Sequence, residues 1–134
     1  MKRRLILITA SLIINGCLAN KAQTSVLVNT IEFGSAGGFA GSVTKYSLES
    51  NGQLSKKQNG ATVPIKLISK KAVKDIFKRA RKLESYKFNA PDDIYSFITL
   101  KTEKSENSIA WGLASTKVND NVVKLYNELM ALTR

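Results

Sequence analysis

The stretch 42–58, SVTKYSLESNGQLSKKQ, carries the clearest fold signal in the sequence. Asn51-Gly52 stands between two strand-like runs, 43–49 and 53–58, and Asn-Gly in such a place is the strongest short signal for a β-hairpin. A second pair, Asn59-Gly60, leads into the run 62–68. Pro64 lies within that run and cannot donate to a β-ladder, so it predicts an edge strand.

The residues before this stretch predict another strand and a glycine-rich connection. The run 24–33, TSVLVNTIEF, is rich in β-branched residues and is typical of a strand. It is followed by GSAGGFAG at 34–41, whose glycines fit neither the dinucleotide nor the P-loop spacing. We expect a flexible or bulged connection here. The alternative is a recognition loop that presents Phe39.

The second half of the chain predicts two amphipathic helices around a further hairpin. Ser69 is a good N-cap for a helix that ends near Glu84, and the last helix spans about 119–133. Strands are expected at 94–101 and 107–111. The fold class is α+β: an antiparallel sheet of hairpins with two amphipathic helices packed on one face, forming a single domain over residues 24–134. The predicted buried helix positions are Val73, Ile76, Phe77, Ala80, Leu83, Val122, Leu125, Leu129 and Leu132.

The start of the chain has the parts of an export signal. Lys2, Arg3 and Arg4 precede the uncharged run 5–14, and a small residue follows soon after. A run of this length is too short to cross a bilayer core, which needs about 20 helical residues. The segment is therefore interpreted as a signal peptide.

The residues that close this segment, Ile14-Asn15-Gly16-Cys17, resemble the lipobox of bacterial lipoprotein precursors. The resemblance implies cleavage between Gly16 and Cys17 and a diacylglyceryl group on the Cys17 thiol. Residues 1–16 are then the removed signal, and 17–23 are the lipidated cysteine and a short tether. The protein is expected in the cell envelope as a membrane-anchored lipoprotein, with the outer membrane favoured over the inner if the cell is Gram-negative. Cleavage after Ala19, which would release a soluble protein, is the alternative.

The composition argues against most catalytic and metal sites. Cys17 is the single cysteine and the chain has no histidine, which excludes an intrachain disulfide, Ser/His/Asp chemistry and Cys/His chemistry. Asp92-Asp93 follows Pro91 and is more typical of a turn than of a metal or catalytic pair. We expect no catalytic residue, no metal and no cofactor, and therefore not an enzyme.

The chain is strongly basic, with a formal charge of +11. An export signal removes nucleic acid from reach, so anionic lipid or acidic envelope polymers are favoured as partners. Basic residues cluster on one side of the first predicted helix, where a solvated helix face is the simplest interpretation. Contact with an anionic membrane surface is the functional alternative. The residues concerned are Lys70, Lys71, Lys74, Lys78, Arg79 and Lys82.

The mature chain also resembles small uncharacterised lipoproteins of Bacteroidota, through FGSAGGFAGSVTKYSLESNGQL, KLISKKAVKDIFKRARKL and KLYNELMAL. This resemblance implies an envelope location and carries over no functional residues. The leading hypothesis is a lipid-anchored envelope protein with a non-catalytic binding or scaffolding domain. Its partners are the membrane and either anionic lipid or an envelope protein. The alternative is an immunity or inhibitor protein that neutralises a toxin or hydrolase, and an enzyme acting on envelope polymers comes third.

Overall fold

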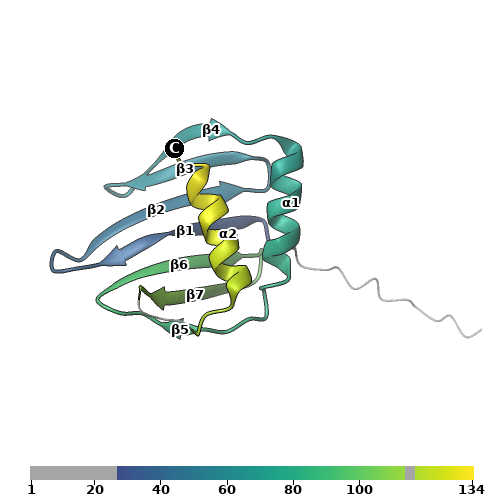
Figure 1. Cartoon of the computed structure of the whole chain (residues 1–134). Helices are drawn as coiled ribbons and strands as arrows, with labels where there is room; N and C mark the ends of the chain where they lie inside the picture. The colour runs from purple at the N-terminus through teal and green to yellow at the C-terminus, as the bar shows by residue number, and fades with distance from the viewer. Residues whose placement is uncertain (1–26, 114–116) are drawn as a thin grey trace, which may run out of the picture.

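The computed structural model describes residues 27–113 and 117–134, and this part of the chain has an α+β fold. Seven strands form one sheet, and two helices follow the fourth and the last strand (Figure 1). The elements in chain order are β1 (Thr30–Gly37), β2 (Ser42–Glu49), β3 (Gln53–Gln58), β4 (Ala61–Leu67), α1 (Lys70–Arg81), β5 (Asn89–Ala90), β6 (Ile94–Lys101), β7 (Glu106–Gly112) and α2 (Asp120–Ala131).

The sheet is built around β1, with the strand order β4-β3-β2-β1-β6-β7-β5. Every pairing from β4 across to β7 is antiparallel. The predicted hairpin at Asn51-Gly52 is confirmed, and Asn59-Gly60 joins β3 to the predicted edge strand in a second hairpin. Asn59 and Gly60 have φ values of 52° and 79°, as a two-residue type I′ turn requires. In the first hairpin the N–H of Gly52 donates to the carbonyl of Glu49 at 2.9 Å, and φ at Gly52 is 96°.

Only the second half of the glycine-rich segment 34–41 connects two strands, which corrects the prediction that the whole segment is a connection. The strand β1 begins at Thr30 and continues through Gly34 to Gly37, so only the next four residues form the turn. A Cβ at Gly34 would lie 1.9 Å from the carbonyl oxygen of Thr44, and one at Gly37 would lie 1.9 Å from that of Asp93. These glycines allow neighbouring backbones to approach closely inside the sheet.

The prediction of a sheet made only of antiparallel hairpins is wrong at one edge. The short strand β5 pairs in parallel with β7, joining Asn89 to Ala110 and Ala90 to Trp111. Residues 82–88 lead from the end of α1 to β5, which lies at the opposite edge of the sheet from β4. A strand of two residues has no alternation pattern, so nothing in the sequence marks it.

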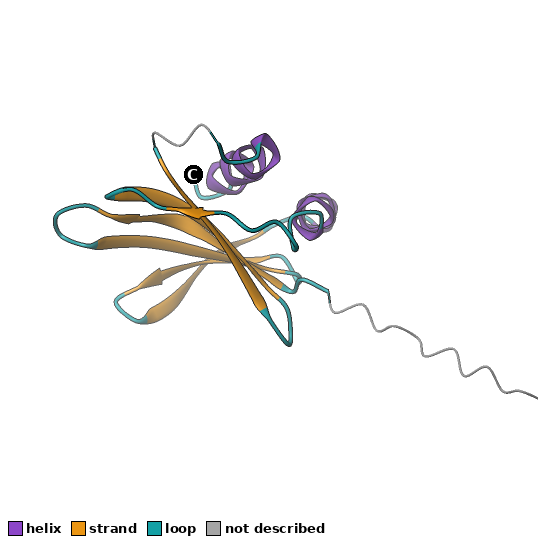
Figure 2. Ribbon diagram, turned by 90° about the horizontal axis from the view of Figure 1, so that it is seen from below, coloured by secondary structure: helices purple, strands orange, loops and turns teal. Residues whose placement is uncertain are grey.

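One hydrophobic cluster joins the helices to the strands. Ile31 and Phe33 on β1 belong to it, together with Leu48, Ile98 and Ile109 on the neighbouring strands. All of the predicted buried positions on the first helix and its end are buried, as are Val122, Leu125 and Leu129 on α2, while Leu132 is partly buried. Figure 2 shows both helices next to the twisted strands.

Side-chain hydrogen bonds cap the start of both helices. The Ser69 hydroxyl accepts from the N–H of Ala72 at 3.3 Å, which confirms the predicted N-cap, and the Asn119 side chain accepts from the N–H of Asn121 at 2.9 Å. After α1, the buried amide of Asn107 donates to the carbonyls of Leu83 and Tyr86. Asn107 therefore ties the segment between α1 and β5 to β7.

The strand β4 lies at the edge of the sheet opposite to β5, which confirms the edge position predicted from Pro64. All seven of its residues are exposed, including the apolar Val63, Ile65 and Leu67. Its pairing with β3 is interrupted by a register shift between Leu54 and Ser55.

Truncation of Leu125, which is 1 % exposed in the shared cluster, tests the assignment of the buried face of α2. We expect Leu125→Ala to lower the free energy of unfolding by about 2–5 kcal/mol through lost burial and a residual cavity. Chemical denaturation followed by circular dichroism measures this. The neighbouring exposed Lys124→Ala is the control and should change the unfolding free energy by less than about 0.5 kcal/mol. Equal effects of the two substitutions would contradict the assigned face.

Candidate functional site

A buried carboxylate lies on the sheet surface opposite the hydrophobic cluster. Successive side chains of a strand point to opposite faces, so Glu32 points away from the face of Ile31 and Phe33. We call this surface the Glu32 face. Ser47 on β2 and Thr99 on β6 stand directly opposite Glu32 on the two flanking strands. These small side chains leave space for longer ones to reach the carboxylate.

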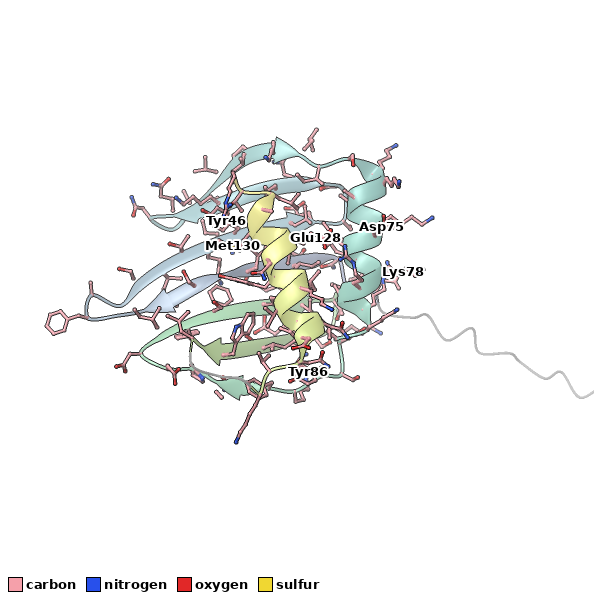
Figure 3. The ribbon with its side chains drawn as sticks, viewed as in Figure 1. Tyr46, Asp75, Lys78, Tyr86, Glu128 and Met130 are labelled. Atoms are coloured by element: carbon pink, nitrogen blue, oxygen red, sulfur yellow. The ribbon has the colours of Figure 1, made fainter. Side chains whose placement is uncertain are left out.

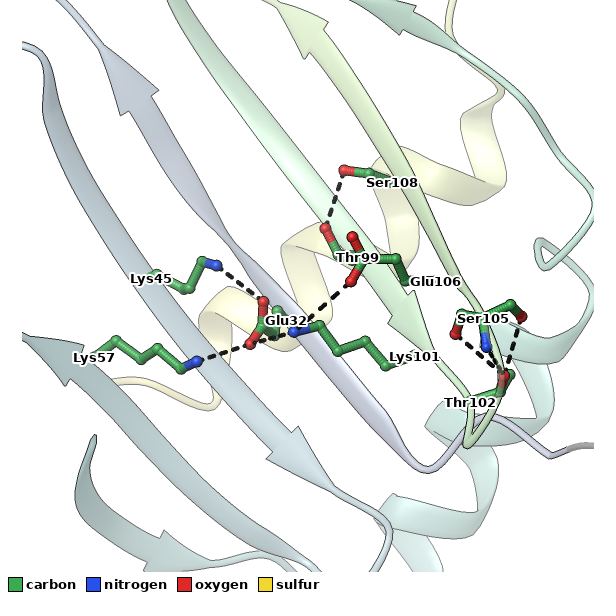
Figure 4. A network of polar contacts seen from close by, with 9 residues as sticks. All are labelled: Glu32, Lys45, Lys57, Thr99, Lys101, Thr102, Ser105, Glu106 and Ser108. Atoms are coloured by element: carbon green, nitrogen blue, oxygen red, sulfur yellow. Dashed lines mark hydrogen bonds and ion pairs between the residues drawn. The ribbon is translucent and has the colours of Figure 1, made fainter. Parts of the chain in front are cut away.

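Three lysines from three different strands converge on Glu32 (Figure 4). The Nζ of Lys45 lies 2.9 Å from Oε2 of Glu32, and the Nζ atoms of Lys57 and Lys101 each lie 3.0 Å from Oε1. Gly34 stands opposite Lys45 in the register, so no side chain blocks the path of that lysine across β1. Lys101 also lies 4.0 Å from the exposed carboxylate of Glu106.

The lysines determine the ionisation of Glu32. Burial raises the pKa of its carboxyl group, but hydrogen bonds from Lys45, Lys101 and Lys57 outweigh burial and lower the pKa from 4.5 to about 2. The carboxylate is therefore charged at neutral pH, and ammonium groups occupy both of its oxygens. A carboxylate held in this way is poorly suited to general acid or base chemistry. The three lysines leave an excess of positive charge on the Glu32 face.

An open groove of about 360 Å³ lies next to this network. Ala36, Phe97 and Ala110 form a small apolar cluster in it, with Tyr95 packed alongside. Lys45 links the groove to the network, because its Nζ lies 5.9 Å from the centre of the Phe97 ring. The hydroxyls of Thr99 and Ser108 are 3.0 Å apart. The full lining is Ala36, Val43, Lys45, Asn89, Pro91, Tyr95, Phe97, Thr99, Ser108 and Ala110, which includes no carboxylate, histidine or cysteine.

The six basic residues predicted on the first helix do not form one surface. Lys70, Lys74 and Lys78 line a cavity of about 470 Å³ together with Arg81, whereas Arg79 and Lys82 line a different one of about 580 Å³ together with Lys124. Lys71 is exposed and lines neither.

Arg79 is paired with α2. Its guanidinium forms an ion pair with Glu128, with Nη2 2.6 Å from Oε1, and Figure 3 shows Glu128 on α2 next to α1. The hydrogen bond that Arg79 donates to the Glu128 carboxylate raises the pKa of Arg79. The role of Arg79 is therefore to join the two helices.

The predicted lipidation and loop residues have different outcomes. Gly16 and Cys17 lie outside the described residues, so the lipid site stays a prediction. Phe39 is fully exposed at the turn between β1 and β2, where the N–H of Gly41 donates to the carbonyl of Gly38. A recognition role for Phe39 also stays a prediction. Asp92 and Asp93 lie in an exposed bend, and the carbonyl of Asp93 accepts from the N–H of Gly38.

Sequence reasoning missed the Glu32 network. A signal was present, because Glu32 is the single charged residue in 24–33 and stands between two large apolar residues. The three lysines that pair with Glu32 lie 13 to 69 positions further along the chain, and only the strand order brings them to its carboxylate. Within the described ranges no group of three or more histidine, cysteine or acidic residues is arranged to hold a metal ion. No helix in the same ranges has the length and hydropathy to span a bilayer.

Comparison with protein-family models finds no match to this chain, and comparison with curated proteins finds none either.

The charge of Glu32 is expected to contribute to stability in a pH-dependent way. Because its pKa is lower in the folded protein, the contribution is complete above about pH 5 and is lost as the pH falls towards 2. The full shift corresponds to ~3 kcal/mol, and screening of the partly exposed lysines reduces it to about 1–2 kcal/mol. We expect Glu32→Gln to lose this amount at pH 7 and to show a shallower dependence of unfolding free energy on pH below 5.

Glu106→Gln is the matched control, because Glu106 is 67 % exposed and pairs with Lys101 at only 4.0 Å. Its unfolding free energy should follow the wild type at each pH in urea denaturation. If Glu32→Gln also follows the wild type, the network has no stabilising role.

Proposed function

We propose that this chain is a lipid-anchored cell-envelope protein whose domain binds or scaffolds a partner without catalysing a reaction. The observation that carries the proposal is Cys17, placed immediately after Gly16 at the end of a short apolar run that follows three basic residues. Two or more acyl chains are sufficient for stable anchoring. The cell envelope is the proposed location, with the outer membrane favoured in a Gram-negative cell.

The chemistry available on the domain supports a binding role. The most deeply buried carboxylate within the described residues is Glu32, and three lysines hold it ionised. The groove beside it offers an apolar cluster, an aromatic side wall and hydroxyl groups. Exposed surfaces of this composition bind proteins or polymers more readily than they perform proton transfer.

We further infer that both helices pack on one face of the sheet and leave the Glu32 face for the partner. The single cluster that contains Val73, Ile76, Val122 and Leu125 together with alternate strand residues supports this arrangement. In this arrangement the helix-covered face stabilises the domain, and the opposite face with its groove is the surface that binds the partner.

Lipid attachment is tested by metabolic labelling with a palmitate analogue. We expect the wild-type protein to take the label and to sediment with membranes even after a high-salt wash, which removes electrostatic binding, and Cys17→Ala to lose both properties because no other thiol is present. A Gly16→Ala variant keeps a small residue before the cysteine and should still be labelled. An unlabelled wild type, or a Cys17→Ala protein that still sediments with salt-washed membranes, would contradict the anchor.

The alternative, an immunity or inhibitor protein, is favoured by one specific observation. Phe39 projects at the tip of the β1–β2 turn and is fully exposed, and a large aromatic side chain of this kind is typical of the residues that dominate protein interfaces. A toxin or hydrolase of the envelope would be the partner.

Phe39→Ala tests whether the β1–β2 turn binds a partner protein or only connects the two strands. We expect the variant to keep the unfolding midpoint of the wild type, because the ring makes no buried contact, and to lose any envelope protein that co-purifies with the wild type after crosslinking. Ala40→Gly, in the same turn, is the control and should keep the partner. A partner retained by Phe39→Ala would remove the turn from the interface.

A further inference from the structure

Four basic residues form a continuous stripe along α1. Lys70, Lys74, Lys78 and Arg81 follow one another at intervals of four, four and three residues. At 100° per residue these positions lie within about 80° of arc around the helix axis. All four side chains are exposed. We call them the α1 stripe.

The α1 stripe borders a cavity with a polar wall and an apolar floor. Ser50 and Asn51, in the turn between β2 and β3, form the wall opposite the helix, and Val73 and Phe77 line the floor. The lining includes no acidic residue. None of the ion pairs found within residues 27–113 and 117–134 involves a residue of the stripe. The four cations are thus available to an external anion.

The second basic cavity, at the other side of α1, differs in this respect. Arg79 lies there between the two helices, and its charge is balanced by Glu128. Lys82 and Lys124 complete its basic lining. The cavity beside the α1 stripe therefore carries more unbalanced positive charge than the second basic cavity.

The α1 stripe also lies where the described chain begins. The N–H of Ser50 donates to the carbonyl of Asn29 at 2.9 Å, so β1 starts beside the wall of the stripe cavity, and Figure 1 shows the start of β1 next to α1. Leu27 lies ten positions after Cys17 in the sequence. A chain of this length spans at most about 35 Å, so a lipid on Cys17 keeps the stripe close to the membrane surface.

We propose that the α1 stripe docks the domain on the anionic phospholipid head groups of the membrane that holds the Cys17 anchor. This inference rests on the proposed lipid anchoring and adds an orientation to it. Each cation near an anionic surface strengthens binding roughly fivefold, and salt weakens the effect. Docking through α1 points the β1–β2 turn away from the membrane, because that turn lies at the opposite end of the strands (Figure 1).

The test uses the mature chain, residues 17–134, with Cys17→Ala so that no lipid contributes. The protein is titrated with phosphatidylcholine vesicles, with and without phosphatidylglycerol, at low and moderate salt. We expect binding only when phosphatidylglycerol is present, and weaker binding at the higher salt. Lys74→Glu with Lys78→Glu should reduce binding more than a hundredfold, since each reversal replaces an attraction by a repulsion.

Lys82→Glu with Lys124→Glu is the matched control, because it makes the same change in net charge at the second basic cavity. Its binding should fall by less than tenfold, through the loss of long-range attraction alone. Circular dichroism and the urea midpoint establish that both double variants are folded. Equal losses in the two variants would mean that net charge, and not the stripe, drives binding, and would overturn the proposal. Binding to phosphatidylcholine alone, or no binding under any condition, would also overturn it.

Vesicle binding of the unlipidated protein and lipid attachment at Cys17 are measured separately, so either can fail without the other. In cells, a lipidated protein with the Lys74→Glu and Lys78→Glu changes should still sediment with membranes, because its acyl chains are sufficient. Palmitate labelling without vesicle binding refutes the docking only. Vesicle binding without labelling refutes the lipid anchor and leaves the stripe as a membrane-binding surface.

Discussion

The register of the sheet depends on a single carboxylate at its centre. Glu32 lies between Ile31 and Phe33 on the middle strand, and its charge is answered by lysines from β2, β3 and β6. A slip of one residue would place this charge among the apolar side chains and turn Ile31 and Phe33 outwards. Both changes are strongly unfavourable, since an unpaired buried charge and exposed apolar side chains each cost free energy. The network thus selects which face of β1 meets the hydrophobic cluster.

The predictable part of the fold is the part with local causes. The hairpins at Asn51-Gly52 and Asn59-Gly60 depend on the positive φ values of Gly52, Asn59 and Gly60, which glycine and asparagine adopt more easily than other residues. The buried faces of α1 and α2 follow from helical spacing, because side chains three or four positions apart lie on the same face of a helix. Even the edge position of β4 follows from one proline. Each of these signals lies within a few residues of the feature that it determines.

The errors have non-local causes. Gly34 and Gly37 belong to β1 because Thr44 and Asp93 approach them closely, and neither neighbour is close in the sequence. β5 exists because Asn89 and Ala110 meet. Helical spacing alone groups the six predicted cations on one side of α1 and its C-cap, but only the tertiary structure decides that Arg79 meets Glu128 while Lys74 borders an open cavity. The lipidation predicted at Cys17 is the reverse case, since the residues that indicate it all lie just before it in the sequence.

Both edges of this sheet are poor templates for a further strand. At β4, Pro64 lacks an N–H group and the register shift disturbs the ladder. At the other edge, β5 has only two residues and ends directly before Pro91. The membrane anchor proposed above would confine this protein to a thin layer, where it would meet its own copies far more often than in free solution. Blunted edges allow such crowding without growth of sheet from one molecule to the next, even though Val63, Ile65 and Leu67 stand exposed along β4.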